Sequence, residues 1–128
     1  MLTSAEILKS AHHVLDLESN SLKLLSDSLD DSFVQAVNTI NATKGRVIIT
    51  GMGKSGHVGR KISASLSSLG TTAYFVHPGE ASHGDLGMIE PNDIVIALSN
   101  SGEAPELSDI IAFCRRFSIK PVSYTHLR

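Results

Sequence analysis

Two stretches near the N-terminus carry apolar residues at the spacing of an α-helix. In the first, from about Thr3 to Asp27, the apolar positions are Ile7, Leu8, Ala11, Val14, Leu15, Leu22 and Leu25. They recur every three or four residues, as on one face of a helix. A second helix is expected from about Ser32 to Thr43, with Asp30 or Asp31 as its cap. Gly45 is expected to end it.

After residue 45 the pattern changes to short apolar runs that alternate with polar loops and helical stretches. The runs predict strands at 46–50, 72–76 and 94–98, with a fourth strand opening at 120–125. Helices are expected after the first and third strands, to about Leu69 and from about Glu106 to Phe117. The polar loops after the strands are residues 51–56, 77–87 and 99–106.

This order predicts the α/β class: a three-layer α/β/α unit with a parallel sheet in flavodoxin-like order, preceded by two N-terminal helices. We expect an N-terminal helical extension over residues 1–44, the α/β domain over 45–120 and an atypical tail over 121–128. The polar loops all follow strands, so they share the carboxyl edge of the sheet. Open α/β folds bind their ligands at that edge.

Composition and charge narrow the class of protein. The chain has 128 residues, 41% of them hydrophobic and 19% charged, with a formal net charge of −2. A chain of this length is expected to form one domain, and its near-neutral charge balance gives no sign of a nucleic-acid surface. No apolar run approaches the ~18 residues of a membrane span, and the start lacks a signal peptide, so we expect a cytoplasmic protein. The chain has a single cysteine, Cys114, which excludes an internal disulfide framework. We expect Cys114 to be a small buried apolar residue.

Residues 51–56 read GMGKSG and formally match G-x-G-x-x-G between a strand and a helix. A dinucleotide site also needs an acidic residue near the end of the second strand, and the nearest acid there is Glu80. A P-loop is excluded, because its motif is absent from the chain. A tight turn would explain one or two glycines but not Lys54 and Ser55 between them. The segment therefore predicts anion binding by backbone N–H groups, a cation and a hydroxyl.

Residues 99–103 (SNSGE) follow the third strand and bring two hydroxyls, an amide and a glycine to the start of a helix, so they also predict anion binding. Ser101 has a second interpretation, as no more than a helix N-cap. If the first and third strands are neighbours, the two loops flank one crevice that offers neutral donors, helix N-termini and one lysine. A sugar phosphate fits this set better than a nucleotide, because no adenine pocket or magnesium carboxylate is evident.

Three segments together resemble the D-arabinose 5-phosphate isomerase family, which is built on the sugar-isomerase (SIS) domain. They are residues 51–61 (GMGKSGHVGRK), 75–89 (FVHPGEASHGDLGMI) and 96–103 (IALSNSGE), within a similarity from about Leu29 to Lys120. The last segment alone indicates only the SIS superfamily, whereas the first two are more specific. The resemblance implies interconversion of D-ribulose 5-phosphate and D-arabinose 5-phosphate through an enediol, the first step toward the lipopolysaccharide sugar Kdo. It also implies a homotetramer that needs no organic cofactor.

The resemblance also assigns roles to residues. Glu106 is the expected base, although a glutamate that complements the helix dipole is equally common at such a position. His83 is expected to transfer a proton or stabilise the enediolate; its alternative is a turn histidine bonded to Asp85. Lys54 is expected to pair with the phosphate or with developing negative charge. The remaining phosphate-binding candidates are Gly53, Ser55, Gly56, Ser99, Asn100, Ser101 and Gly102.

Three further residues match functional positions of the family. His77 corresponds to a position that binds zinc as an inhibitory ion, although only His83 and Glu80 lie near it in the sequence. Gly70 and Thr71 correspond to substrate contacts. They precede a strand and therefore lie at the opposite edge of the sheet, so they reach a ligand only if it belongs to another subunit.

The chain also departs from the family. Family members are longer: their SIS domain continues through another strand and helix, and many then carry two CBS domains. The polar segment 121–128 stands where the family has an apolar strand, so we expect a C-terminal truncation or a foreign tail. Such a fragment is expected to fold marginally and to be a poor or inactive catalyst. The alternative function is a non-catalytic SIS module that binds a phosphosugar and regulates a partner.

Overall fold

A parallel sheet of four strands organises the chain in the computed structural model, which describes residues 2–102 and 104–125. The strands are β1 (Val47–Gly51), β2 (Ala73–Phe75), β3 (Ile94–Ser99) and β4 (Lys120–Thr125). Their order is β2-β1-β3-β4, so β1 and β3 are neighbours in the middle of the sheet. The predicted parallel sheet and its flavodoxin-like order are therefore confirmed. Of the expected tail, residues 126–128 lie outside the described part.

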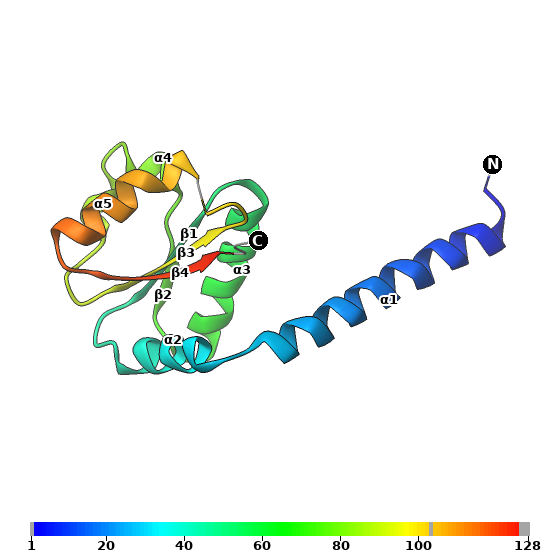
Figure 1. Ribbon diagram of the computed structural model, residues 1–128. Coiled ribbons are helices and arrows are strands. Elements are labelled where there is room, and N and C mark those ends of the chain that lie inside the picture. The colour runs from blue at the N-terminus through cyan, green and yellow to red at the C-terminus, as the bar shows by residue number, and fades with distance from the viewer. Residues whose placement is uncertain (1, 103, 126–128) are drawn as a thin grey trace. The chain divides into compact units, whose positions relative to one another are not determined.

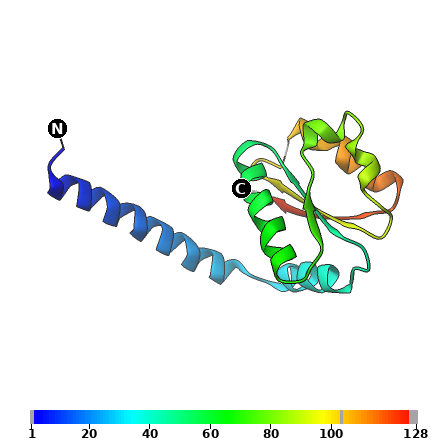
Figure 2. The same ribbon diagram turned by 180° about the vertical axis from the view of Figure 1, so that it is seen from behind.

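Helices cover both faces of the sheet: α3 (Gly53–Ser68) lies on one face, and α4 (Pro78–Ala81) and α5 (Ser108–Arg116) lie on the other. Helices α1 (Ser4–Ser28) and α2 (Asp31–Ala42) precede the first strand in the chain, and the short 3-10 helices η1 (Asp85–Met88) and η2 (Pro105–Leu107) lie between strands. Figure 1 shows α3 on one face and α4 with α5 on the other, and Figure 2 shows the same layers from behind. The predicted three-layer α/β/α architecture is confirmed.

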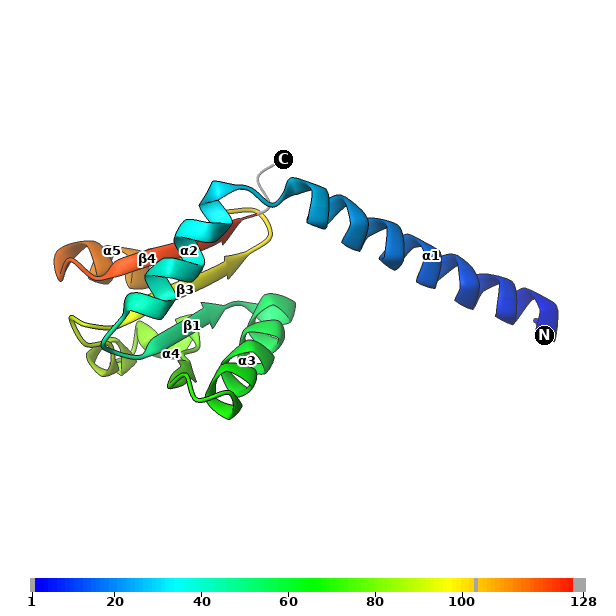
Figure 3. The ribbon, with the colours of Figure 1, turned by 90° about the horizontal axis from the view of Figure 1, so that it is seen from below.

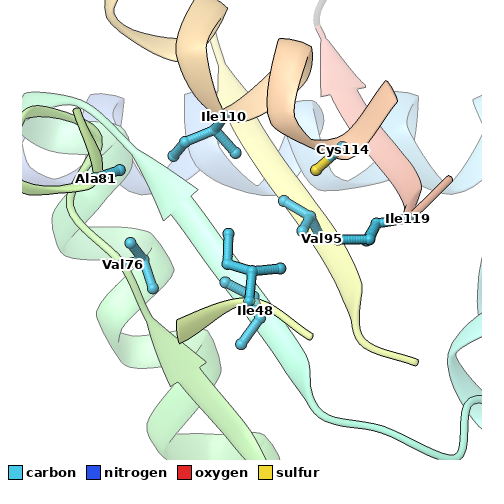
Figure 4. Close-up of a cluster of buried hydrophobic side chains, with 8 residues drawn as sticks. Ile48, Val76, Ala81, Val95, Ile110, Cys114 and Ile119 are labelled. Carbon is cyan, nitrogen blue, oxygen red and sulfur yellow. The ribbon is translucent and has the colours of Figure 1, made fainter. Parts of the chain in front are cut away.

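Alternate residues of the central strands supply two separate apolar clusters, because successive side chains of a strand point to opposite faces. Ile48 and Val95 pack beneath α4 and α5, together with Val76, Ala81, Ile89, Ile110, Cys114 and Ile119 (Figure 4). Val47, Ile49 and Ile94 pack on the other face against α3. Strands buried on both faces explain why their sequences read as continuous apolar runs. Cys114 is fully buried as predicted, and burial raises the pKa of its thiol.

The chain divides into two compact units, Met1–Val37 and Asn38–Arg128. In the first unit α1 begins with a capping box: the Thr3 hydroxyl accepts from the Glu6 amide, and the Glu6 carboxylate accepts from the Thr3 amide at 2.7 Å. The two predicted N-terminal helices are confirmed to within a residue or two. The predicted boundary at residue 44 stays a prediction.

Two local expectations need correction. The second helix ends at Ala42, and Gly45 lies where any Cβ atom would overlap the backbone of Asn92. Gly45 is therefore needed for a close approach between two loops and not to end the helix. The predicted polar loop 77–87 instead contains α4 and η1. Proline at the first position of α4 explains this, since its fixed φ angle suits a helix start.

An ion pair joins the amino ends of β1 and β3. The Asp93 carboxylate, whose side chain is 1% exposed, accepts from the Arg46 guanidinium at 2.7 Å and 3.1 Å. It also accepts from the backbone amides of Arg46 at 2.7 Å and Glu90 at 2.8 Å. Burial by itself raises the pKa of Asp93, but these hydrogen bonds outweigh burial and hold that pKa below its ordinary value. The pair therefore secures the end of the sheet opposite to the polar loops.

Candidate functional site

The carboxyl ends of β1 and β3 bring the two predicted phosphate loops together. Gly51 and Leu98 are paired in the parallel ladder, so the chain leaves β1 at Met52 beside the point where it reaches Ser99 on β3. In Figure 3 the arrowheads of both strands point the same way, and α3 begins beside the arrowhead of β1. Residues 51–56 and 99–102 thus share one edge of the sheet, as the sequence predicts.

The start of α3 leaves backbone donors for an anion. Met52 occupies the N-cap position and makes no capping hydrogen bond with its side chain. Gly53 has a φ of +53°, a backbone conformation that side chains with a Cβ rarely adopt. Gly56 lies so close to β1 that a Cβ there would stand 2.6 Å from the Gly51 carbonyl oxygen. The glycines therefore bring the helix start against the strand end, next to the exposed Lys54.

The loop after β3 is a tight turn with a hydroxyl at its base. The Ser99 hydroxyl oxygen accepts from the Gly102 amide at 3.0 Å, and Gly102 has a φ of +75°. The next helical element, η2, begins at Pro105 with Ala104 in the N-cap position. Ser101 is therefore not a helix N-cap, which removes that interpretation. The hydrogen of the Ser99 hydroxyl remains able to donate to a ligand.

Glu106 lies in η2, and His83 lies just after α4, which contacts η2. Glu106 is the middle residue of η2, and both residues are exposed. The segment that carries His83 is tied to α5 by a hydrogen bond of 2.6 Å from the Ser82 hydroxyl to Asp109. Among the described residues no hydrogen bond or ion pair engages the side chain of His83, Glu106 or Lys54. The alternative of a turn histidine bonded to Asp85 is therefore not realised among those residues.

Gly70 and Thr71 lie at the other end of the sheet, as the sequence indicates. They follow the last turn of α3, where Gly70 has a φ of +93° and the Thr71 amide donates to the Leu66 carbonyl at 2.9 Å. This is a glycine-terminated helix end, which by itself explains the glycine. A hollow of about 290 Å³ also lies on this side of the molecule, at the amino ends of β3 and β4. It contains none of the predicted site residues.

The residues around His77 do not fit a zinc ion. The Nδ1 atom of His77 accepts from the Gly79 amide at 3.2 Å and caps α4, so only Nε2 remains for a metal. Within residues 2–102 and 104–125, no group of three or more histidine, cysteine or acidic side chains is placed to hold a metal ion. Zinc normally takes three or four protein ligands.

Two features of this edge were missed by sequence reasoning. One is the Ser82–Asp109 hydrogen bond, which joins residues that are 27 positions apart. The other is Thr50, a polar residue within the apolar run of β1 that is completely buried. A hydroxyl in an apolar strand directly before the glycine loop was a signal available in the sequence.

Comparison with known proteins shows the family. The family description of the SIS domain matches residues 40–127. The chain belongs to the SIS domain family. Arabinose 5-phosphate isomerase KdsD of Pseudomonas aeruginosa is 46% identical over 125 residues, which cover 98% of this chain and 38% of that protein. KdsD of Yersinia pestis is 49% identical over 111 residues, covering 87% of this chain and 34% of the relative.

A solved structure is also similar to this chain in fold. The Escherichia coli CFT073 protein c3406 in complex with A5P is 32% identical, with a TM-score of 0.93 over 98% of this chain and 67% of that one. The SIS chain spans little more than a third of the length of its KdsD relatives. Within its described residues no helix is long and apolar enough to cross a membrane.

Proposed function

We propose that this SIS chain carries the phosphosugar site of an aldose–ketose isomerase that interconverts D-arabinose 5-phosphate and D-ribulose 5-phosphate. The observation that carries the proposal is that β1 and β3 are neighbours, so that the two predicted phosphate-binding loops begin side by side at their carboxyl ends. The chain is also 46% identical to a KdsD isomerase. The c3406 complex with A5P adds a similar chain with the same ligand class. Such an enzyme would act in the cytoplasm, in the first step toward Kdo.

The proposed chemistry assigns each task to one group. Backbone N–H groups at the start of α3, with Ser55 and Ser99, bind the phosphate, and Lys54 supplies positive charge. Glu106 removes the proton from C2 of arabinose 5-phosphate, giving an enediol, and the proton returns at C1 to give the ketose. His83 moves protons between the sugar oxygens O1 and O2 during this exchange. The reaction is redox-neutral overall and needs no organic cofactor.

Hydrogen exchange with solvent tests this assignment directly. When a protein that contains this chain and extends to the length of its KdsD relatives is incubated with D-arabinose 5-phosphate in deuterated water, we expect deuterium at C2 of the sugar and at C1 of ribulose 5-phosphate, measured by NMR. A base that exchanges its proton with solvent during the enediol stage requires this result. Tight binding without exchange contradicts the isomerase and supports the alternative, a non-catalytic phosphosugar-binding regulator.

We also propose that the chain forms a homo-oligomer. Helix α1 buries none of its residues, yet large apolar side chains line it, including Leu8, Leu15, Leu22 and Leu25. An exposed apolar stripe of this length is typical of a protein interface. Light scattering after gel filtration is expected to give a multiple of the 13.6 kDa chain mass, such as the tetramer of the family. A single 13.6 kDa species at micromolar concentration contradicts this.

A further inference from the structure

Helix α4 is too short to hold its own position. It has four residues, and isolated helices of this length are not stable in water. Two of its residues, Pro78 and Ala81, are buried in the core. Helix α4 also contacts α5 and η2, and α4 and α5 lie on the same face of the sheet (Figure 1). The position of the segment that follows α4, which carries His83, therefore depends on these neighbouring elements.

One hydrogen bond joins the end of α4 to α5. The Ser82 hydroxyl, at the C-cap of α4, donates to the Asp109 carboxylate at 2.6 Å. This distance is typical of a hydroxyl bound to an ionised carboxylate, a hydrogen bond roughly twice as strong as one between neutral groups. In the described part of the chain, no other hydrogen bond connects α4 or its C-cap with η2 or α5. Asp109 also forms no ion pair with any described residue.

The two ends of this hydrogen bond lie beside the proposed catalytic residues. His83 directly follows Ser82, and its amide donates to the Glu80 carbonyl at 2.9 Å, so its backbone belongs to the turn that ends α4. Glu106 precedes Asp109 in a helical run in which η2 passes directly into α5. Residues spaced in this way occupy neighbouring positions on one helix face. The hydrogen bond therefore connects the segment of His83 with the segment of Glu106.

The two segments differ in how firmly the core holds them. Leu107 is 3% exposed and Ile110 is 1% exposed, so the core fixes η2 and the start of α5. His83 is exposed, and Gly84 after it has a φ of +134°, a conformation that residues with a Cβ rarely adopt. The backbone next to His83 therefore has the freedom of a glycine. We expect the hydrogen bond of Ser82 to restrain the histidine segment against the fixed η2 segment.

We propose that the Ser82 hydroxyl and the Asp109 carboxylate are positioning groups that hold His83 at its working distance from Glu106 during isomerisation. This inference rests on the proposed isomerase function. Proton transfers at neighbouring sugar atoms need both groups in place, and a displacement of about 1 Å can cost as much as ~10²-fold in rate. An aspartate in the first turn of α5 also complements the helix dipole, but that role does not involve the serine.

Steady-state kinetics test the inference in a protein that contains this chain and extends to the length of its KdsD relatives. We expect Ser82→Ala to lower kcat for D-arabinose 5-phosphate about 10-fold, with KM within about twofold of the parental value, because the phosphate loops are unchanged. Asp109→Ala is expected to have the same effect. The double variant is expected to be no slower than either single variant, since all three lack the same hydrogen bond. Asp109→Asn keeps an acceptor oxygen and is expected to stay within about threefold of the parental kcat.

The matched control is Ser67→Ala. The Ser67 hydroxyl also makes one hydrogen bond, to the Ala73 carbonyl at 3.0 Å, but at the opposite end of the sheet. This variant is expected to keep the parental kcat and KM. Thermal melting of each variant monitors the fold, and Ser82→Ala is expected to melt close to the parental temperature.

Each other result overturns the inference in an identifiable way. Parental kcat in Ser82→Ala excludes a positioning role and leaves the proposed function intact. Losses that add up in the double variant show two independent effects, and equal losses in Asp109→Asn and Asp109→Ala assign the aspartate to the helix dipole. A lowered melting temperature of Ser82→Ala assigns the hydroxyl to the fold. If the parent protein does not convert the sugar phosphate, the proposed function fails and the inference fails with it.

Discussion

Replacement of Glu106 by glutamine is expected to lower the exchange of the substrate's C2 hydrogen by about 10²- to 10⁴-fold, the usual contribution of a general base. Glutamine has nearly the same shape as glutamate but no basic oxygen. The affinity for D-arabinose 5-phosphate is expected to stay within about threefold, because the phosphate is assigned to the loops at 51–56 and 99–102. Exchange measured by NMR and binding measured by calorimetry on the same preparation check both parts.

The competing interpretation makes a different prediction for the same variant. A glutamate that only complements the helix dipole contributes about 0.3–1 kcal/mol of stability and nothing to the exchange rate. Glu90→Gln is the matched control, since Glu90 is also an exposed glutamate but lies at the amino end of β3. Parental exchange in Glu106→Gln would show that another group is the base.

Replacement of Asp93 by asparagine is expected to lower the free energy of unfolding by about 3 kcal/mol, because it leaves the Arg46 guanidinium without its buried partner. The carboxylate accepts four hydrogen bonds, two from the guanidinium and two from backbone amides. Glu90→Gln removes the second carboxylate that pairs with Arg46, which is 70% exposed, and is expected to cost less than about 1 kcal/mol. Urea unfolding of both variants measures the difference, and equal losses would contradict the account.

The Asp93 carboxylate is also expected to make the free energy of unfolding depend on pH. The pKa of Asp93 is lower in the folded chain than in the unfolded chain, so the unfolded state binds the proton more readily. Its contribution is fully present above its unfolded pKa of about 3.9 and is lost as the pH falls through the folded pKa. Between pH 6 and pH 3 the parent is expected to lose more stability than Asp93→Asn. An equal loss of unfolding free energy between pH 6 and pH 3 in the parent and in Asp93→Asn would contradict this expectation.

The strands and their order were predictable because parallel strands are buried on both faces. A run such as residues 46–50 then reads as apolar throughout, and the polar loops that follow must share an edge. The candidate loops were predictable for the same reason, since their glycines are required where α3 meets β1. In these segments the local sequence pattern and the topology of the sheet predict the same strands and the same loop positions.

The features that escaped prediction depend on contacts between distant residues. Helix α4 has only four residues, and the burial of its Pro78 and Ala81 against the sheet stabilises it more than its own sequence does. The partner of Ser82 lies 27 residues away, and the complete burial of Thr50 depends on layers contributed by later elements. Periodicity within a short window carries none of this information.

An NMR titration of the chain with D-arabinose 5-phosphate tests the central claim most directly. The claim is that one ligand is bound by the loops after β1 and β3 together, at the carboxyl edge of the sheet. We expect the largest amide shifts at residues 53–56 and 99–102, with smaller shifts at His83 and Glu106. Inorganic phosphate is expected to shift the amide signals of residues 53–56 and 99–102 and to leave those of His83 and Glu106 unchanged. Shifts confined to the opposite edge, around Gly70 or Asn92, would contradict the account.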